Sequence, residues 1–153
     1  MNVNKSNLLY FFLLLTLSSL FCSCSSNSEE DEIIPNTYIN ATIYLDYYSE
    51  LGSVGNAIYF ETINGSSVGY LGHGVIVVKV NNGFSAFDAT CSHDIDDEAH
   101  VELDGTFAEC PICNSKFNLL DGGYPFEGSV ARYPLKEFST SYSSSSNTLR
   151  IYN

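Results

Sequence analysis

Apolar and polar residues alternate along most of the chain after residue 36, and this period of two predicts β-strands. The most apolar of these segments is 74–80 (GVIVVKV), which predicts a central strand. No segment beyond residue 23 sustains a helical period. Short strands without helices predict an all-β fold, either an antiparallel sandwich or a small barrel. The same pattern predicts further strands at 37–45, 57–63, 84–90, 99–103, 106–109, 116–119, 130–138 and 148–152.

Turn-forming residues stand between the predicted strands. Asn81-Asn82-Gly83 predicts a tight hairpin turn, because asparagine and glycine accept the positive φ that such turns need. Asp104-Gly105 predicts a second hairpin, while Gly122-Gly123 and the serine run 143–146 predict loops. We expect residues 37–153 to form one domain, because this length can bury one hydrophobic core but not two.

The first 23 residues predict a targeting segment. Lys5 supplies a positive charge, and residues 8–17 form an apolar run that is too short for a stable membrane span. Ser23 then precedes Cys24, an arrangement similar to bacterial lipoprotein signals, in which a cysteine after a small residue becomes the lipid-modified N-terminus. The alternative is a cleaved secretory signal in which Cys22 and Cys24 are incidental.

Residues 24–36 are rich in serine and acidic residues, a composition that predicts a polar tether between a lipid anchor and the domain. The resemblance to lipoprotein signals implies export and lipid anchoring to the bacterial cell envelope, on the periplasmic face or at the cell surface.

The chain is acidic, with eighteen acidic residues against six Lys and Arg and a formal charge of −12. Such a charge repels nucleic acid and anionic lipid headgroups. We therefore expect no nucleic-acid partner, membrane contact only through the lipid anchor, and a basic surface on any protein that docks electrostatically. The alternative is that the charge only keeps an exported domain soluble.

Two short segments combine thiol and imidazole side chains in the order C-x-H…C-x-x-C. Cys91 and His93 stand in the first segment, and Cys110 and Cys113 stand in the second, which begins after sixteen intervening residues. Thiolate and imidazole ligands favour iron–sulfur clusters and zinc over hard cations. We predict one metal centre held between loops 91–98 and 110–118.

This pattern resembles the Rieske [2Fe–2S] motif C-x-H…C-x-x-H, with Cys113 in place of the final histidine. The resemblance covers about 74–153, where the block Cys110–Phe117, the turn Gly122-Gly123 and the segment Tyr133-Pro134-Leu135 occur in Rieske order. It implies a Rieske-like antiparallel fold in which a small subdomain of two hairpin loops carries the cluster. Asn114 replaces the usual glycine, and we expect it to keep the left-handed backbone of that turn.

The resemblance also implies roles for the ligands. Cys91 and Cys110 would hold the inner iron, His93 and Cys113 the outer iron, and Ser115 would donate a hydrogen bond to a bridging sulfide. The third thiolate and the four acidic residues between positions 94 and 98 add negative charge. We therefore expect a reduction potential near or below the lower end of the Rieske range of about −150 to +300 mV. The implied function is single-electron transfer to a redox partner protein, by a carrier without a catalytic domain of its own.

The same residues also fit other interpretations. Three cysteines and one histidine are a common zinc set, which would make the protein a cell-envelope binding or interaction module. Export as an unfolded chain could also leave the site without metal and allow a Cys110–Cys113 disulfide. A thiol–disulfide enzyme built on the same pair is disfavoured, because its first cysteine needs a helix N-terminus and residues 114–120 show no helical pattern.

The two remaining histidines are expected to be structural. His73 lies between two glycines and predicts an exposed turn, and His100 predicts a surface or half-buried position in the hairpin between the two ligand loops. No nucleophile setting, phosphate-binding glycine loop or carboxylate pair stands out, so we predict no catalytic residues.

Overall fold

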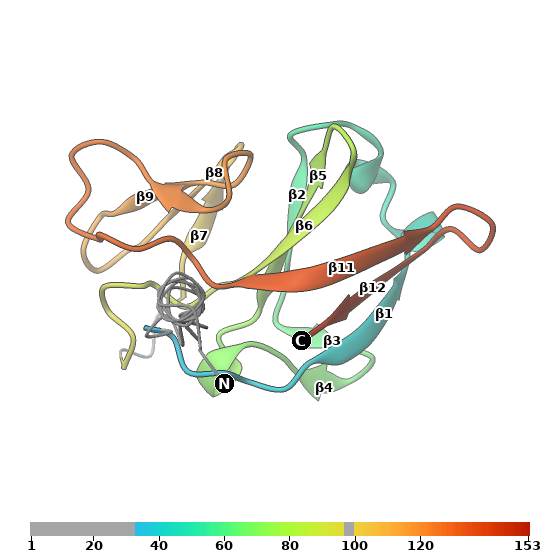
Figure 1. The fold of residues 1–153 in the computed structure, drawn as a ribbon, viewed down its shortest axis with the longest axis horizontal. Coiled ribbons are helices and arrows are strands. Elements are labelled where there is room, and N and C mark those ends of the chain that lie inside the picture. Colours follow the sequence, from blue (N-terminus) through green and yellow to red (C-terminus); the bar gives the residue numbers. More distant parts are fainter. Residues whose placement is uncertain (1–32, 97–99) are drawn as a thin grey trace, which may run out of the picture. The chain divides into compact units, whose positions relative to one another are not determined.

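The computed structural model of the protein describes residues 33–96 and 100–153, which are coloured along the chain in Figure 1. The predicted signal peptide, Cys24 and the tether up to residue 32 lie outside the described residues, as do positions 97–99 of the first ligand loop. Within the described ranges, no helix is long and apolar enough to cross a membrane.

A six-stranded sheet holds most of the strands that the alternating pattern predicts. Its order is β1-β12-β11-β6-β5-β2, and every neighbouring pair is antiparallel. The predicted all-β antiparallel class is therefore confirmed (Figure 1). The strands are β1 (Asn40–Tyr44), β2 (Ala57–Phe60), β5 (Val75–Val80), β6 (Gly83–Asp88), β11 (Glu137–Ser143) and β12 (Thr148–Tyr152).

A smaller antiparallel sheet of four strands, in the order β10-β9-β8-β7, carries the second ligand loop. Its strands are β7 (Glu102–Asp104), β8 (Phe107–Glu109), β9 (Lys116–Asn118) and β10 (Tyr124–Pro125). A short hairpin is formed by β3 (Thr62–Ile63) and β4 (Ser66–Ser67), and three 3-10 turns are η2 (Leu45–Tyr47), η3 (Ser49–Gly52) and η4 (Tyr70–Gly72). The period-of-two pattern did not predict these turns, because each spans only three or four residues.

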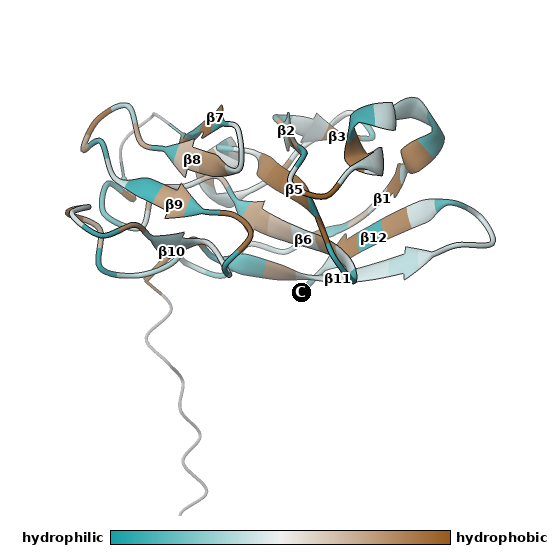
Figure 2. Ribbon diagram, turned by 90° about the horizontal axis from the view of Figure 1, so that it is seen from above, coloured by the Kyte–Doolittle hydropathy of each residue, from teal (hydrophilic) through white to brown (hydrophobic). Residues whose placement is uncertain are grey.

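Strand β5 packs into both hydrophobic clusters of the core. Val75, Ile76, Val77 and Val78 are all fully buried, and successive side chains of a strand point to opposite faces. Val75 and Val77 pack into one cluster with apolar residues of β1, β11 and β12. Ile76 and Val78 pack into a second cluster that includes buried residues of β8 and β9. Burial on both faces explains the near-continuous apolar sequence of β5, visible in Figure 2.

Several boundaries differ from the prediction. The strand expected at 130–138 instead begins at Glu137 and continues to Ser143, while residues 130–136 lie outside any strand. Pro134 has no N–H for a sheet ladder, whereas residues 139–143 of the serine-rich strand pair with β12 and need apolar residues on one face only. The strand expected at 57–63 is interrupted at Glu61.

The prediction of an exposed His73 was wrong. The residue keeps 7% of its accessible surface, and Tyr59 Oη of β2 donates a hydrogen bond to His73 O (2.9 Å), which holds this turn against the large sheet. A hydrogen bond between its Nδ1 and Thr90 Oγ1 (3.0 Å) compensates for part of the lost hydration. The expected half-buried position of His100 is confirmed.

The shared core predicts a clear contrast between two leucines of the same segment of chain. Leu135 is 2% exposed and packs in the cluster that joins the two sheets, whereas Leu120 is 44% exposed. Leu135→Ala should lower the free energy of unfolding by about 2–5 kcal/mol, and Leu120→Ala by less than about 1 kcal/mol. Chemical denaturation followed by circular dichroism measures both. Equal effects of the two variants would contradict the assignment of a core shared by both sheets.

Candidate metal centre

Two loops from different sheets form the site. The first begins where β6 ends, and a bridge between Thr90 and His100 holds its two ends together. The second joins β8 to β9, and it is closed by hydrogen bonds from Asn114 N to Cys110 O (2.9 Å) and from Cys110 N to Ser115 O (2.9 Å). Asn114 has a φ of 57°, so the expected left-handed turn is confirmed.

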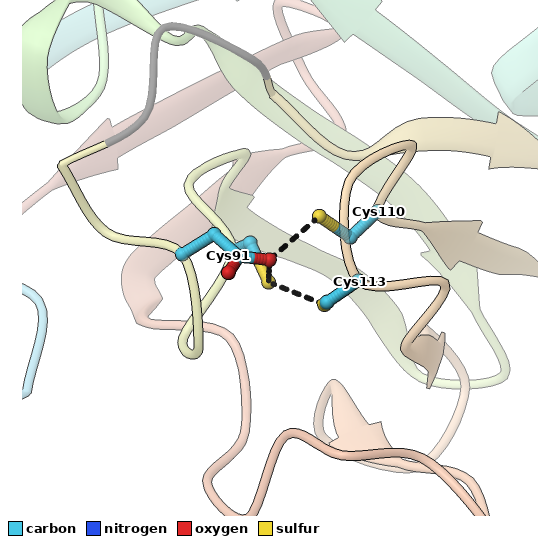
Figure 3. A group of neighbouring side chains, drawn as sticks. Cys91, Cys110 and Cys113 are labelled. Carbon is cyan, nitrogen blue, oxygen red and sulfur yellow. Dashed lines mark hydrogen bonds between the residues drawn. The ribbon is translucent and has the colours of Figure 1, made fainter.

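The loops bring together the three cysteines of the predicted ligand set. Cys110 and Cys113 come from the β8–β9 loop and face Cys91 of the first loop (Figure 3). The Sγ atoms of Cys91 and Cys113 are 3.7 Å apart. Cys91 and Cys110 are fully buried, Cys113 is partly exposed, and all three are free thiols. The chain after Cys113 continues into β9 and forms no helix, which agrees with the sequence argument against a thiol–disulfide enzyme.

The fourth group that faces these sulfurs is Asp94, not His93. Asp94 Oδ2 lies 3.4 Å from Cys110 Sγ and 3.9 Å from Cys91 Sγ. One ligand atom each from Cys91, Asp94, Cys110 and Cys113 lies within 4.8 Å of all the others. The sequence analysis predicted for Asp94 only a contribution to the negative charge of the first loop. The spacing Cys91-x-x-Asp94 repeats that of Cys110-x-x-Cys113, and this repeat is the signal that could have identified it.

His93 lies beside this group and outside it. Its side chain is 48% exposed, and its Nδ1 is 2.8 Å from Asp94 Oδ1. The two oxygens of Asp94 therefore face different neighbours, Oδ2 towards the thiols and Oδ1 towards the imidazole. The assignment of His93 as a ligand stays a prediction.

Ser115 and Ser92 secure the two loops. The buried Ser115 hydroxyl accepts a hydrogen bond from Ala131 N (2.9 Å) and lies 3.2 Å from Cys113 Sγ. In the bond with Ala131 the backbone N–H is the donor, so the hydroxyl proton of Ser115 can still be donated to a Cys113 thiolate. Ser92 Oγ donates to Tyr133 O (2.6 Å) and ties the first loop to the segment before β11.

Burial controls the ionisation of the site. It raises the pKa of the Cys91 thiol well above its usual range, although the backbone at Asp94 and His93 donates towards that sulfur. Burial likewise raises the pKa of Cys110. Burial alone would also raise the pKa of Asp94, but hydrogen bonds from Cys113, His93 and Cys110 outweigh it and lower that pKa. Without a cation, the two buried thiols are therefore protonated at neutral pH beside an ionised carboxylate, and a metal that binds them must displace protons.

The donor set fits a thiolate-bound metal. In a tetrahedral zinc site, Zn–S bonds of about 2.3 Å separate two thiolates by about 3.8 Å, and the Cys91–Cys113 separation is 3.7 Å. Three thiols with an imidazole or a carboxylate also suit an iron–sulfur cluster chemically. Ligands of two different irons lie farther apart than ligands of one ion, so the compact arrangement matches a single ion more closely.

Comparisons with known proteins give structural likenesses of low identity. No family model matches the chain, and none of the curated proteins matches it. The complex of reduced oxygenase and oxidized ferredoxin in carbazole 1,9a-dioxygenase contains a chain with 21% identity and a TM-score of 0.46, over 75% of this chain and 92% of that one. The ferredoxin of carbazole 1,9a-dioxygenase from Nocardioides aromaticivorans IC177 has 18% identity and a TM-score of 0.45, over 76% and 98%. A putative NADH-dependent nitrite reductase small subunit from Mycobacterium tuberculosis has 13% identity and a TM-score of 0.44, over 77% and 97%. At such low identity, function has to be argued from the residues of the site.

The burial of the thiols predicts an order of alkylation in the metal-free protein. Cys113 should react with iodoacetamide first, because it is the one partly exposed thiol of the three. Cys91 and Cys110 should react more slowly at pH 8, because burial raises the pKa of each thiol and so lowers its thiolate fraction. Their rates should keep rising as the pH increases beyond 9, because each thiolate fraction grows until the pH passes the raised pKa.

Peptide mass spectrometry of time points measures these rates, and the urea-unfolded protein is the control in which the three cysteines react alike. Alkylation of Cys91 in the folded protein as fast as that of Cys113 would show that the site is open to solvent.

Proposed function

We propose that the protein is a Rieske-like carrier of single electrons that binds a [2Fe–2S] cluster through Cys91, His93, Cys110 and Cys113. The observation that carries this proposal is the convergence of three thiols from two loops of different sheets. When bound, the cluster would supply reversible one-electron transfer. With no catalytic residues predicted beside it, the protein would serve a separate redox partner.

The chain's own residues would then hold and protect the centre. Burial of Cys91 and Cys110 excludes water from the inner side of the site. Ser115 would hydrogen-bond to sulfur, and this interaction stabilises the more negative, reduced state. The negative charge of Asp94 acts in the opposite direction and favours a low potential.

The cellular setting is part of the proposal. The signal-like segment before Cys24 supports export and lipid anchoring to the bacterial cell envelope, with residues 24–36 as the tether. The excess of acidic residues supports a basic docking surface on the redox partner.

A second candidate is a single zinc ion bound by Cys91, Asp94, Cys110 and Cys113. The compactness of this four-residue group favours it, because structural zinc sites are closed and tetrahedral. A zinc-bound protein of this kind would be a stabilised binding module of the cell envelope, without a redox role. Zinc also needs no cytosolic assembly machinery, so export as an unfolded chain would present no obstacle.

Metal analysis separates the two candidates. The protein would be purified without oxygen, once after cytosolic expression from Ser25 onward and once after export by its own leader. The proposal predicts iron and acid-labile sulfide in the stoichiometry of a [2Fe–2S] cluster in both samples, with the visible absorption of such a cluster. Zinc in stoichiometric amount would support the second candidate. A colourless, metal-free protein from both sources would contradict both.

The identity of the fourth ligand gives an independent test. If a cluster is bound, His93→Ala should abolish its visible absorption while Asp94→Ala retains it. If zinc is bound, Asp94→Ala should weaken zinc affinity by at least about tenfold, while His93→Ala has the smaller effect. Asp96→Ala is the matched control, because this exposed residue lies in the same loop and outside the ligand group. Spectra and zinc competition with a chelator provide the readouts, and unchanged binding in both test variants would exclude both residues as ligands.

A further inference from the structure

A second polar site lies apart from the cysteines, in a cleft of about 380 Å³. Two of its lining residues, Tyr59 and His100, stack their rings in parallel at a centroid distance of 4.4 Å. Glu61 and Asp96 supply carboxylates, and the buried His73 lines the inner part. The volume falls within the range of about 300–1,000 Å³ that is typical of small-molecule sites.

A chain of hydrogen bonds fixes the tautomer of His73. Asp88 accepts hydrogen bonds from Tyr70 N (2.7 Å) and Thr90 N (2.9 Å), so it acts as a buried acceptor. Thr90 Oγ1 donates its one proton to Asp88 Oδ1 at 2.6 Å, the length of a charge-assisted bond. Thr90 Oγ1 must therefore accept from His73 Nδ1, 3.0 Å away. In the neutral imidazole, this leaves the lone pair on Nε2.

That lone pair faces the cleft. His73 Nε2 has no hydrogen-bond partner among the described residues. No fully buried side-chain nitrogen or oxygen of the described residues lacks a partner, so Nε2 has to be reached by solvent. His73 is only 7% exposed and lines the cleft, which makes the cleft the route of access. The His73 side chain is thus a nearly buried hydrogen-bond acceptor. Thr90 fixes its tautomer, and its Nε2 is accessible to a ligand in the cleft.

The surroundings of this acceptor favour a cation. Neither Lys nor Arg is among the described residues that line the cleft. Burial and then the negative charge of Glu61 raise the pKa of Tyr59, so the field of Glu61 reaches this aromatic wall. A metal ion is a poorer match, because the close groups of three or more potential ligands found in the described residues do not include His73 or His100.

We propose that this cleft binds a small primary alkylammonium ion, which donates an N–H to His73 Nε2, faces the carboxylates of Glu61 and Asp96, and packs against the Tyr59–His100 pair. The rings contribute apolar contact and attraction to the cation. The inference does not depend on which metal, if any, the cysteines hold.

Three probes of similar size test the proposal on the intact purified protein. Ligand-observed NMR titration would compare n-butylammonium, n-butyltrimethylammonium and n-butanol. The proposal predicts that n-butylammonium binds at least about fivefold more tightly than either of the others, because one analogue lacks the N–H donor and the other lacks the charge. Equal binding of the trimethyl analogue would overturn the role of His73, and equal binding of the alcohol would overturn cation recognition.

A pair of surface variants tests the site without disturbing the buried hydrogen bonds among Asp88, Thr90 and His73. Glu61→Gln should weaken n-butylammonium binding by about three- to fivefold. Glu50→Gln, at another exposed glutamate outside the cleft, should leave it unchanged. Equal effects of the two substitutions would mean that the ammonium ion responds only to overall charge, and the cleft would be rejected as its site.

Discussion

Burial of both faces of β5 is the constraint on which the rest of the fold depends. One face closes the core of the large sheet, and the other packs against the small sheet that carries Cys110 and Cys113. Cys91 follows β6, the direct neighbour of β5, so the shared core also sets the distance between the two ligand loops. The site is consequently as rigid as the packing beneath it, even though its residues lie in loops. Loss of that packing would move the sulfur atoms apart even though all three cysteines would still be present.

The same burial makes ionisation of the cysteines unfavourable in the metal-free protein. Two fully buried thiols have raised pKa values, and they lie beside a carboxylate whose pKa is lowered. Creating thiolates there without a cation would place several negative charges within 4.8 Å of one another in a poorly solvated region. A bound cation offsets this repulsion directly. The electrostatics therefore favour metal binding.

Sequence reasoning predicted the parts of the fold that depend on local chemistry. The apolar run of β5, the hairpin at Asp104-Gly105 and the left-handed Asn114 follow from burial and turn preferences that neighbouring residues determine. It failed where distant contacts decide. The serine-rich β11 is a strand because β12 pairs with it, and Thr90 supplies the partner that compensates for the burial of the His73 ring. Asp94 was missed for the same reason, since it is sixteen positions from Cys110 in the sequence and meets it only when the two loops come together.

Asp94 and His93, the two candidates for the fourth ligand, contact each other and act as a pair. One oxygen of Asp94 faces the thiols and the other accepts from the imidazole, in the manner of the carboxylate–histidine contacts that orient ligands around metals. If Asp94 binds the ion, His93 donates a hydrogen bond to the carboxylate and orients it from the exposed side. If His93 binds, Asp94 can hold one ring nitrogen and leave the other free. The fourth ligand then decides the charge of the centre, because a neutral imidazole leaves it one unit less negative than a carboxylate does. A less negative centre accepts an electron more readily, so the choice between these adjacent residues bears directly on whether the site can serve in electron transfer.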